Sequence, residues 1–211
     1  MADTPTLGDH LLQRGISRRG FMKFCTALAT AMAMPPSFAR EMAERMEGAK
    51  RQSVIWLSFQ ECTGCTESLT RSASPTLESL IFDFISLDYH HTLQAASGHA
   101  AERARTEAME RAGEGGYLVV VDGSIPTGEG GAYSTIAGMT NLQMLAETVA
   151  DAAAVISVGT CASFGGIPFA QPNPTGARSV EALMEWGEVP KKPVINVSGC
   201  PPIPVVISGT L

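Results

Sequence analysis

The chain has 211 residues, enough for one domain with a substantial core, and 45% of them are hydrophobic while 17% are charged. The net charge of −6 argues against a nucleic-acid or anionic-membrane partner. No apolar run reaches the roughly 18–20 residues that a bilayer span needs, and the five cysteines lack the spacing of a disulfide framework. The composition therefore predicts a globular protein with no nucleic-acid partner.

Residues 1–39 have the features of an export signal rather than of the fold. Arg18 and Arg19 precede an Ala- and Met-rich run at 24–34, and residues 37–39 place small side chains at the two positions that a signal peptidase reads. The paired arginines make the segment resemble a twin-arginine signal. The alternative interpretation is an amphipathic helix with an exposed Arg pair. We expect a twin-arginine signal peptide over residues 1–39.

Apolar strand-like segments alternate with helix-like segments along the rest of the chain. A charged N-terminal tether, beginning as a helix, is expected at 40–53 and leads into a domain of residues 54–211. The predicted strands are 54–59, 81–87, 117–121, 154–158 and 194–197, and the predicted helices are 67–71, 99–112, 141–152 and 179–186, with Pro75 as a further helical start and Asn141 as a cap. This alternation predicts an α/β fold, a parallel sheet with helices on both faces.

Four cysteines follow the ends of predicted strands. Cys62 and Cys65 come after the first strand, Cys161 after the fourth and Cys200 after the fifth. In such sheets ligands bind outside the carboxyl ends of the strands. Four unrelated small hydrophobic residues would be scattered instead. The sequence therefore predicts that these four thiols share a ligand, whereas Cys25 lies in the predicted signal.

Four thiolates suit either a zinc ion or an iron–sulfur cluster. Structural zinc usually holds short loops together, and this chain has enough apolar strands to form a core without it. A cluster also explains the glycines beside the cysteines, because glycine allows close backbone approach and its N–H can point at a sulfide. These glycines are Gly64, Gly159, Gly165, Gly166 and Gly199. Zinc, and a disulfide pair in an exported protein, remain alternatives.

Three segments resemble the small subunit of nickel–iron hydrogenases: ECTGCTES at 61–68, GTCAS at 159–163 and GCPPIP at 199–204. The resemblance runs from the signal to the last residue, and it looks most like the exported, membrane-associated uptake type. It implies a flavodoxin-like, doubly wound parallel sheet that holds one proximal 4Fe-4S cluster. The ligands that it implies are Cys62, Cys65, Cys161 and Cys200, with Glu61 near a subunit interface.

The resemblance also implies the partners of this chain. A large subunit, forming a heterodimer with it, would split hydrogen at a nickel–iron centre, and this chain would take electrons from that centre one at a time. It implies the twin-arginine export machinery, a place in the periplasm on the outer side of the cytoplasmic membrane, and, in the full-length protein, a membrane electron acceptor such as a cytochrome b or a quinone reductase. Because the chain stops at Leu211, we expect only the N-terminal part, with the C-terminal cluster domain absent.

Several alternatives remain beside this resemblance. One alternative is the related cluster-bearing subunit of respiratory quinone reductases. That family carries adjacent cysteines at the first ligand site and no export signal, so both features of this chain argue against it. A non-enzymatic protein that binds zinc through four cysteines, or an inert truncated fragment, would also account for the chain. Oxygen-tolerant hydrogenases carry extra cysteines where this chain has Gly64 and Gly166, so the resemblance implies a standard cubane and oxygen sensitivity.

Three further polar residues lie near the same rim. Glu61 is equally well explained as an ordinary carboxylate at the end of a strand. His90 and His91 follow the second predicted strand, and neighbouring side chains there point opposite ways. We therefore expect surface or interface roles for the two histidines.

Overall fold

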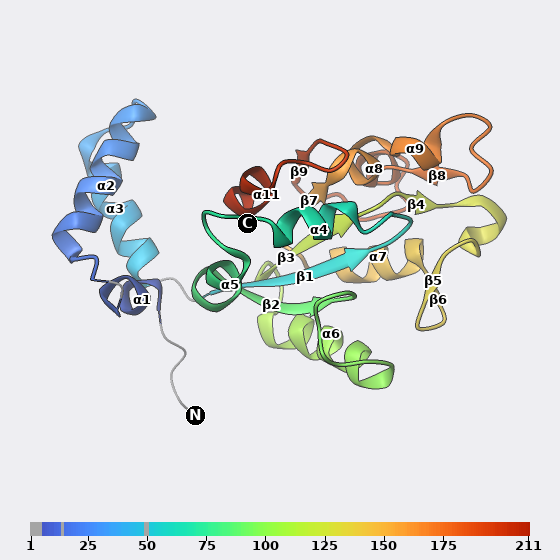
Figure 1. Ribbon diagram of the computed structural model, residues 1–211, viewed down its shortest axis with the longest axis horizontal. Helices are drawn as coiled ribbons and strands as arrows, with labels where there is room; N and C mark the ends of the chain where they lie inside the picture. The colour runs from blue at the N-terminus through green and yellow to red at the C-terminus, as the bar shows by residue number, and fades with distance from the viewer. Residues whose placement is uncertain (1–5, 14, 49–50) are drawn as a thin grey trace. The chain divides into compact units, whose positions relative to one another are not determined.

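The computed structural model describes residues 6–13, 15–48 and 51–211, and it divides into two compact units, Met1–Gln52 and Ser53–Leu211 (Figure 1). The described part of the first unit contains α1 (Leu7–Gln13), α2 (Arg18–Ala31) and α3 (Pro36–Glu47). None of the described helices combines the length and the apolar character that crossing a membrane would need.

The first unit is held together by the packing of α2 on α3. Helix α2 starts at the predicted signal arginines because Ser17 Oγ accepts a hydrogen bond of 3.2 Å from the backbone of Gly20. Phe21 and Cys25 of α2 are buried together with Ala43 of α3. The helical start expected for residues 40–53 is therefore present as part of α3. Removal of residues 1–39 as a signal stays a prediction.

The second unit is organised around a five-stranded sheet, as far as the described residues extend. Its strands are β1 (Gln52–Ser58), β2 (Ile85–His90), β3 (Tyr117–Asp122), β7 (Ala154–Val158) and β9 (Val194–Val197), in the order β2-β1-β3-β7-β9. The pairs β1–β3, β3–β7 and β7–β9 are parallel. This order is that of flavodoxin-like doubly wound sheets. The predicted α/β fold class is confirmed (Figure 1).

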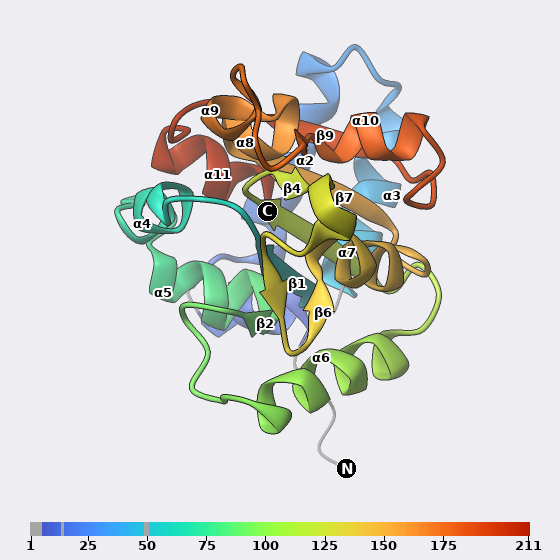
Figure 2. The same ribbon diagram turned by 90° about the vertical axis from the view of Figure 1, so that its right-hand side faces the viewer.

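Helices cover both faces of this sheet because the side chains of β1 are buried on both sides. Ile55 and Leu57 contribute to a core with α6 (His99–Ala112), α7 (Asn141–Val149) and α10 (Val180–Glu185). Val54 and Trp56, which point the other way, contribute to a core with α4 (Gly64–Thr70) and α11 (Pro204–Thr210). Figure 2 shows α4 and α11 on the left of the sheet and α7 and α10 on its right.

The prediction of a strand over 81–87 is wrong in its first half. Thr76 Oγ1 accepts a hydrogen bond of 3.2 Å from the backbone of Ser79 and starts α5 (Leu77–Ser79). The helical turn continues as a π-helix, Leu80–Phe84, before β2 begins. A local cap therefore overrides the strand propensity of the apolar residues that follow it.

Asn141 is not the cap of α7, because the side chain of Thr140 bonds the backbone of Gln143 and that of Gln143 bonds the backbone of Thr140.

The predicted segments 99–112, 154–158 and 194–197 match α6, β7 and β9 in both bounds. The sequence did not predict α8 (Gly159–Phe164), α9 (Gly166–Phe169), α11 or the short elements, which are β4 (Ile125–Pro126), η2 (Gly128–Gly131), β5 (Thr135–Ile136), β6 (Met139–Thr140) and β8 (Ala177–Arg178).

The expected surface role of His90 is wrong. Its side chain is 1% exposed and stacks on Trp56, with ring centroids 4.9 Å apart. Burial, and the neighbouring His91, lower the pKa of His90 to about 4. His90 is therefore a neutral core residue, and His91 is partly buried in a polar network described below.

Candidate metal centre

The four predicted ligands, Cys62, Cys65, Cys161 and Cys200, line one pocket at the carboxyl ends of the parallel strands. The pocket extends across the carboxyl ends of β1, β3, β7 and β9, and this range includes the β1–β3 switch point at which ligands bind in this strand order. Its lining residues come from the last residue of β3 and from the segments after β1, β7 and β9: Glu61, Cys62, Gly64, Cys65, Asp122, Thr160, Cys161, Gly199, Cys200 and Pro201. The structure thus brings together all four cysteines that the sequence singled out.

Cys62 and Cys65 are presented by the turn between β1 and α4. Thr63 adopts a left-handed backbone conformation, with φ of 67°, which turns the chain into α4 directly after Cys62. Cys65 consequently lies in the first turn of α4 and is partly buried, whereas Cys62 is exposed.

Cys161 and Cys200 come from neighbouring strand ends that are tied together by hydrogen bonds. The backbone N–H of Thr160 donates to the carbonyl of Gly199 at 2.8 Å, and Thr160 Oγ1 accepts from the Gly199 N–H at 3.3 Å. Cys161 lies on α8, a helix that the sequence did not predict. These bonds fix the third and fourth thiols relative to each other.

Two glycines leave the space that the sulfur atoms occupy. A Cβ atom on Gly159 would lie 2.5 Å from Cys65 Sγ, and a Cβ atom on Gly166 would lie 2.5 Å from Cys161 Sγ. Both residues also have positive φ values, 85° and 60°, which favour glycine. The close approach predicted for the five glycines beside the thiols agrees with this geometry at Gly159 and Gly166. At Gly165 and Gly199 an added Cβ atom would instead meet Phe169 and Pro202.

The inner part of the pocket disfavours charge. Burial is the main reason that the pKa values of the Cys65 and Cys161 thiols are raised. Burial, followed by repulsion from Glu61, raises the pKa of the Asp122 carboxyl to about 7. The two buried thiols therefore keep their protons until a cation compensates the thiolate charge.

Asp122 is a site residue that the sequence analysis did not single out. It ends β3, is 1% exposed, and accepts a hydrogen bond of 3.5 Å from Thr66 Oγ1. Sequence offered one signal for it, an acidic residue at the carboxyl end of an otherwise apolar strand. The side chain contacts the Cys65 thiol and thereby adds to the raised pKa of that thiol.

Glu61 lines the same pocket beside the first cysteine. Its Oε1 accepts a hydrogen bond of 3.3 Å from Thr63 Oγ1, while its Oε2 is buried and has no partner among the described residues. Burial raises the pKa of Glu61. The expected interface role of this residue stays a prediction.

The donor set fits an iron–sulfur cluster. The four cysteines are free thiols, so no disulfide occupies them. A 4Fe-4S cluster takes four cysteine thiolates, and the four thiols that line this pocket match that number.

Comparison with known proteins identifies the family. Residues 62–211 match the protein family described as NADH ubiquinone oxidoreductase, 20 Kd subunit. The chain is 48% identical over 204 residues to the periplasmic [NiFe] hydrogenase small subunit 1 of Nitratidesulfovibrio vulgaris, covering 96% of this chain and 62% of that protein. It is 45% identical over 199 residues to the hydrogenase-2 small chain of Escherichia coli, covering 93% of this chain and 52% of that protein.

Solved structures give the same result. The Ni-Fe-Se hydrogenase of Desulfomicrobium baculatum matches with a TM-score of 0.73 and 36% identity, over 76% of this chain and 60% of that chain. The chain spans between about half and two thirds of the length of the relatives that it matches. It belongs to the family of the 20 kDa subunit of NADH–ubiquinone oxidoreductase, and within that family it corresponds to the N-terminal part of nickel–iron hydrogenase small subunits.

Proposed function

We propose that this chain is the electron-transfer small subunit of a nickel–iron hydrogenase and that Cys62, Cys65, Cys161 and Cys200 bind one proximal 4Fe-4S cluster. The observation that carries the proposal is the set of four free thiols, brought from three strand ends to one pocket in which two glycines leave room at the sulfur atoms. When bound, such a cluster would supply one-electron redox chemistry.

The residues of the pocket divide into a buried side and an open side. Cys65 and Cys161 are partly buried beside Asp122, and they hold the inner half of the site away from water. Cys62 and Cys200 are exposed, so the outer half faces whatever protein binds this rim. The open side, next to Glu61, is where we place the large subunit that carries the nickel–iron centre.

The names of the relatives support the wider assembly. The Nitratidesulfovibrio protein is named a periplasmic hydrogenase subunit, and a Wolinella succinogenes relative, 44% identical over 194 residues, is named the small chain of a quinone-reactive Ni/Fe-hydrogenase. We therefore place this chain in a heterodimer at the outer side of the cytoplasmic membrane. In the full-length protein, a cytochrome b or a quinone reductase is the proposed electron acceptor.

Metal and sulfide content tests the proposal most directly. Residues 40–211, co-expressed with the large subunit and purified without oxygen, are expected to contain about four iron and four sulfide in this chain. Cys161→Ser should lower both contents strongly, because it removes one ligand of the inner half. Cys161→Ser and Cys25→Ser are compared in the full chain, where Cys25 is buried in the first unit and its substitution should leave both contents unchanged. Zinc without sulfide would overturn the proposal and favour a zinc-binding protein.

Export by the twin-arginine route is a second expected outcome. Arg18→Lys together with Arg19→Lys should keep the precursor in the cytoplasm, measured as the share of the large subunit found in the periplasmic fraction, because the paired guanidinium groups define this signal class. Arg40→Lys together with Arg45→Lys is the control, with the same change of residue type just after the predicted signal. Equal periplasmic shares for the two double variants would contradict the twin-arginine assignment.

A further inference from the structure

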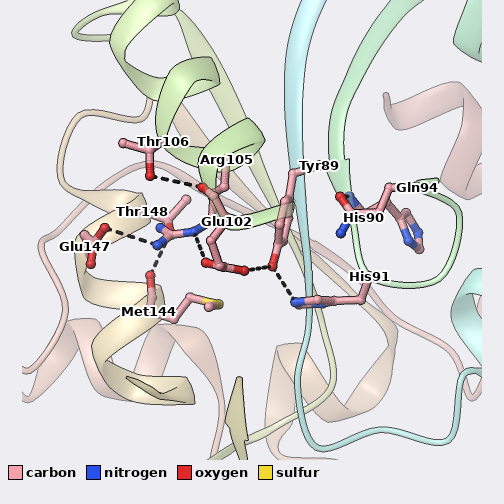
Figure 3. A network of polar contacts seen from close by, with 10 residues as sticks. All are labelled: Tyr89, His90, His91, Gln94, Glu102, Arg105, Thr106, Met144, Glu147 and Thr148. Atoms are coloured by element: carbon pink, nitrogen blue, oxygen red, sulfur yellow. Dashed lines mark hydrogen bonds and ion pairs between the residues drawn. The ribbon is translucent and has the colours of Figure 1, made fainter. Parts of the chain in front are cut away.

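A continuous network of hydrogen bonds joins the end of β1 to α6 and α7. Figure 3 shows its side chains from His91 to Thr148. The network begins at the backbone N–H of Ser58, the last residue of β1, which donates to His91 Nδ1 at 2.9 Å. His91 is the first residue after β2. Its ring therefore ties the end of β1 to the segment that follows β2.

The bond from Ser58 fixes which atom donates in the next two hydrogen bonds of the network. Because Nδ1 accepts a hydrogen bond, the neutral ring carries its proton on Nε2. His91 Nε2 therefore donates to Tyr89 Oη at 2.9 Å, and Tyr89 Oη donates to Glu102 Oε1 at 2.6 Å. Figure 3 shows these three side chains in line between β2 and α6.

A buried arginine holds the far end of the network. Arg105, 3% exposed, donates from Nε to Glu102 Oε2 at 3.1 Å. Its other two nitrogens donate to Thr148 Oγ1 at 2.9 Å and to Glu147 Oε1 at 3.2 Å, both on α7. The orientation of His91 is thus set by fixed groups on two helices that pack against the sheet.

Ser58 is the point where β1 loses its support on the β2 side. On the β3 side the pairing continues, since Phe59 N–H donates to the carbonyl of Asp122 at 2.8 Å and Gln60 N–H to that of Ser124 at 3.1 Å. The polypeptide reaches Cys62 four residues after Ser58. Among the described residues, the His91 bond is the last hydrogen bond of β1 on that side before the loop with the first two cysteines.

We propose that His91, oriented by Tyr89 and Glu102, is a positioning residue for the Cys62–Cys65 loop and that it tunes the reduction potential of the cluster bound there. The inference rests on the proposed function. A merely structural role of the network would change only the stability of the protein. A positioning role changes the place of the ligand loop, and with it the hydrogen bonds and the solvent exposure that set a cluster potential.

The test uses the assembled heterodimer with four single variants. His91→Phe removes the acceptor for Ser58, while His91→Asn keeps an acceptor oxygen near the position of Nδ1. Tyr89→Phe removes the group that orients His91. Thr106→Val is the control, because the exposed Thr106 hydroxyl on α6 donates to the backbone carbonyl of Glu102 and to no side chain among the described residues. The readouts are the midpoint potential and the electron paramagnetic resonance spectrum of the reduced cluster, with amide hydrogen exchange over residues 54–61.

We expect His91→Phe to shift the potential, to change the spectrum and to speed exchange about five- to tenfold, as the loss of one buried hydrogen bond predicts. Tyr89→Phe should shift the potential in the same direction by a smaller amount. The potential of His91→Asn should lie closer to that of the unmodified protein than to that of His91→Phe, and Thr106→Val should match the unmodified protein. If His91→Phe does not fold, Tyr89→Phe and His91→Asn carry the same comparison.

Two results would overturn the inference and one would overturn its basis. An unchanged potential and spectrum in His91→Phe and Tyr89→Phe, with or without a lower melting temperature, would reduce the network to a structural role. A shift in His91→Asn as large as in His91→Phe would show that the acceptor for Ser58 is not the cause. Absence of a 4Fe-4S spectrum in the unmodified heterodimer would instead contradict the proposed function itself.

Discussion

Gly159→Ala is expected to prevent cluster assembly almost completely. The added Cβ atom would lie 2.5 Å from Cys65 Sγ, a distance at which one of the two must move. Cys65 lies in the first turn of α4 and Gly159 is the first residue of α8, directly after β7, so neither backbone can yield without disturbing the site. The measurement is iron and sulfide per heterodimer after anaerobic purification, with the cluster spectrum as a second readout.

A matched control separates this contact from backbone strain. Gly187 has a similar positive φ, 79° against 85°, but a Cβ atom there meets nothing within 4 Å. Gly187→Ala should therefore cost about 1 kcal/mol of folding free energy, the ordinary penalty of an L-residue in this region, and should leave the iron content unchanged. Equal iron contents in Gly159→Ala and Gly187→Ala would contradict the assignment of the pocket as the cluster site.

The strand ends could be predicted from the sequence because their signals are local. The buried strands of this sheet are short apolar runs bounded by glycine or polar residues, as at 154–158, where the predicted and observed bounds agree. Once parallel strands are inferred, their carboxyl ends share one edge, so the four cysteines could be assigned to one rim without knowing any distance. The structure adds that all four line a single pocket.

The features that the sequence did not predict depend on tertiary contacts. Histidine is a polar residue type, so the sequence favours a surface position for His90. Only the packing of β2 beside β1 stacks its ring on Trp56. The sequence pattern around Asp122 indicates the start of a turn. Its burial beside Cys65 depends on the turn after β1 lying next to the end of β3. The π-helix at Leu80–Phe84 follows from a cap at Thr76 that competes with a strong strand pattern. Non-local burial and competing local signals are what a single sequence leaves open.

Arg105→Met is expected to lower the free energy of unfolding by about 3 kcal/mol, the scale of breaking one side of a buried ion pair. Arg105 is 3% exposed and bonds two carboxylates and one hydroxyl. Methionine keeps much of the side-chain volume but leaves Glu102, 21% exposed, facing a hydrophobic side chain in place of a guanidinium. Urea unfolding followed by circular dichroism at neutral pH measures the difference.

Arg111→Met is the matched control on the same helix. Arg111 pairs with Asp88 at 3.1 Å but is 64% exposed, so water replaces most of what the pair contributes and the expected loss is between 0 and about 1 kcal/mol. The ratio of the two losses tests whether burial, rather than the number of ion pairs, gives Arg105 its effect. Similar losses for both variants would mean that Glu102 and Glu147 are solvated without Arg105, and that the buried network does not hold α6 and α7 together.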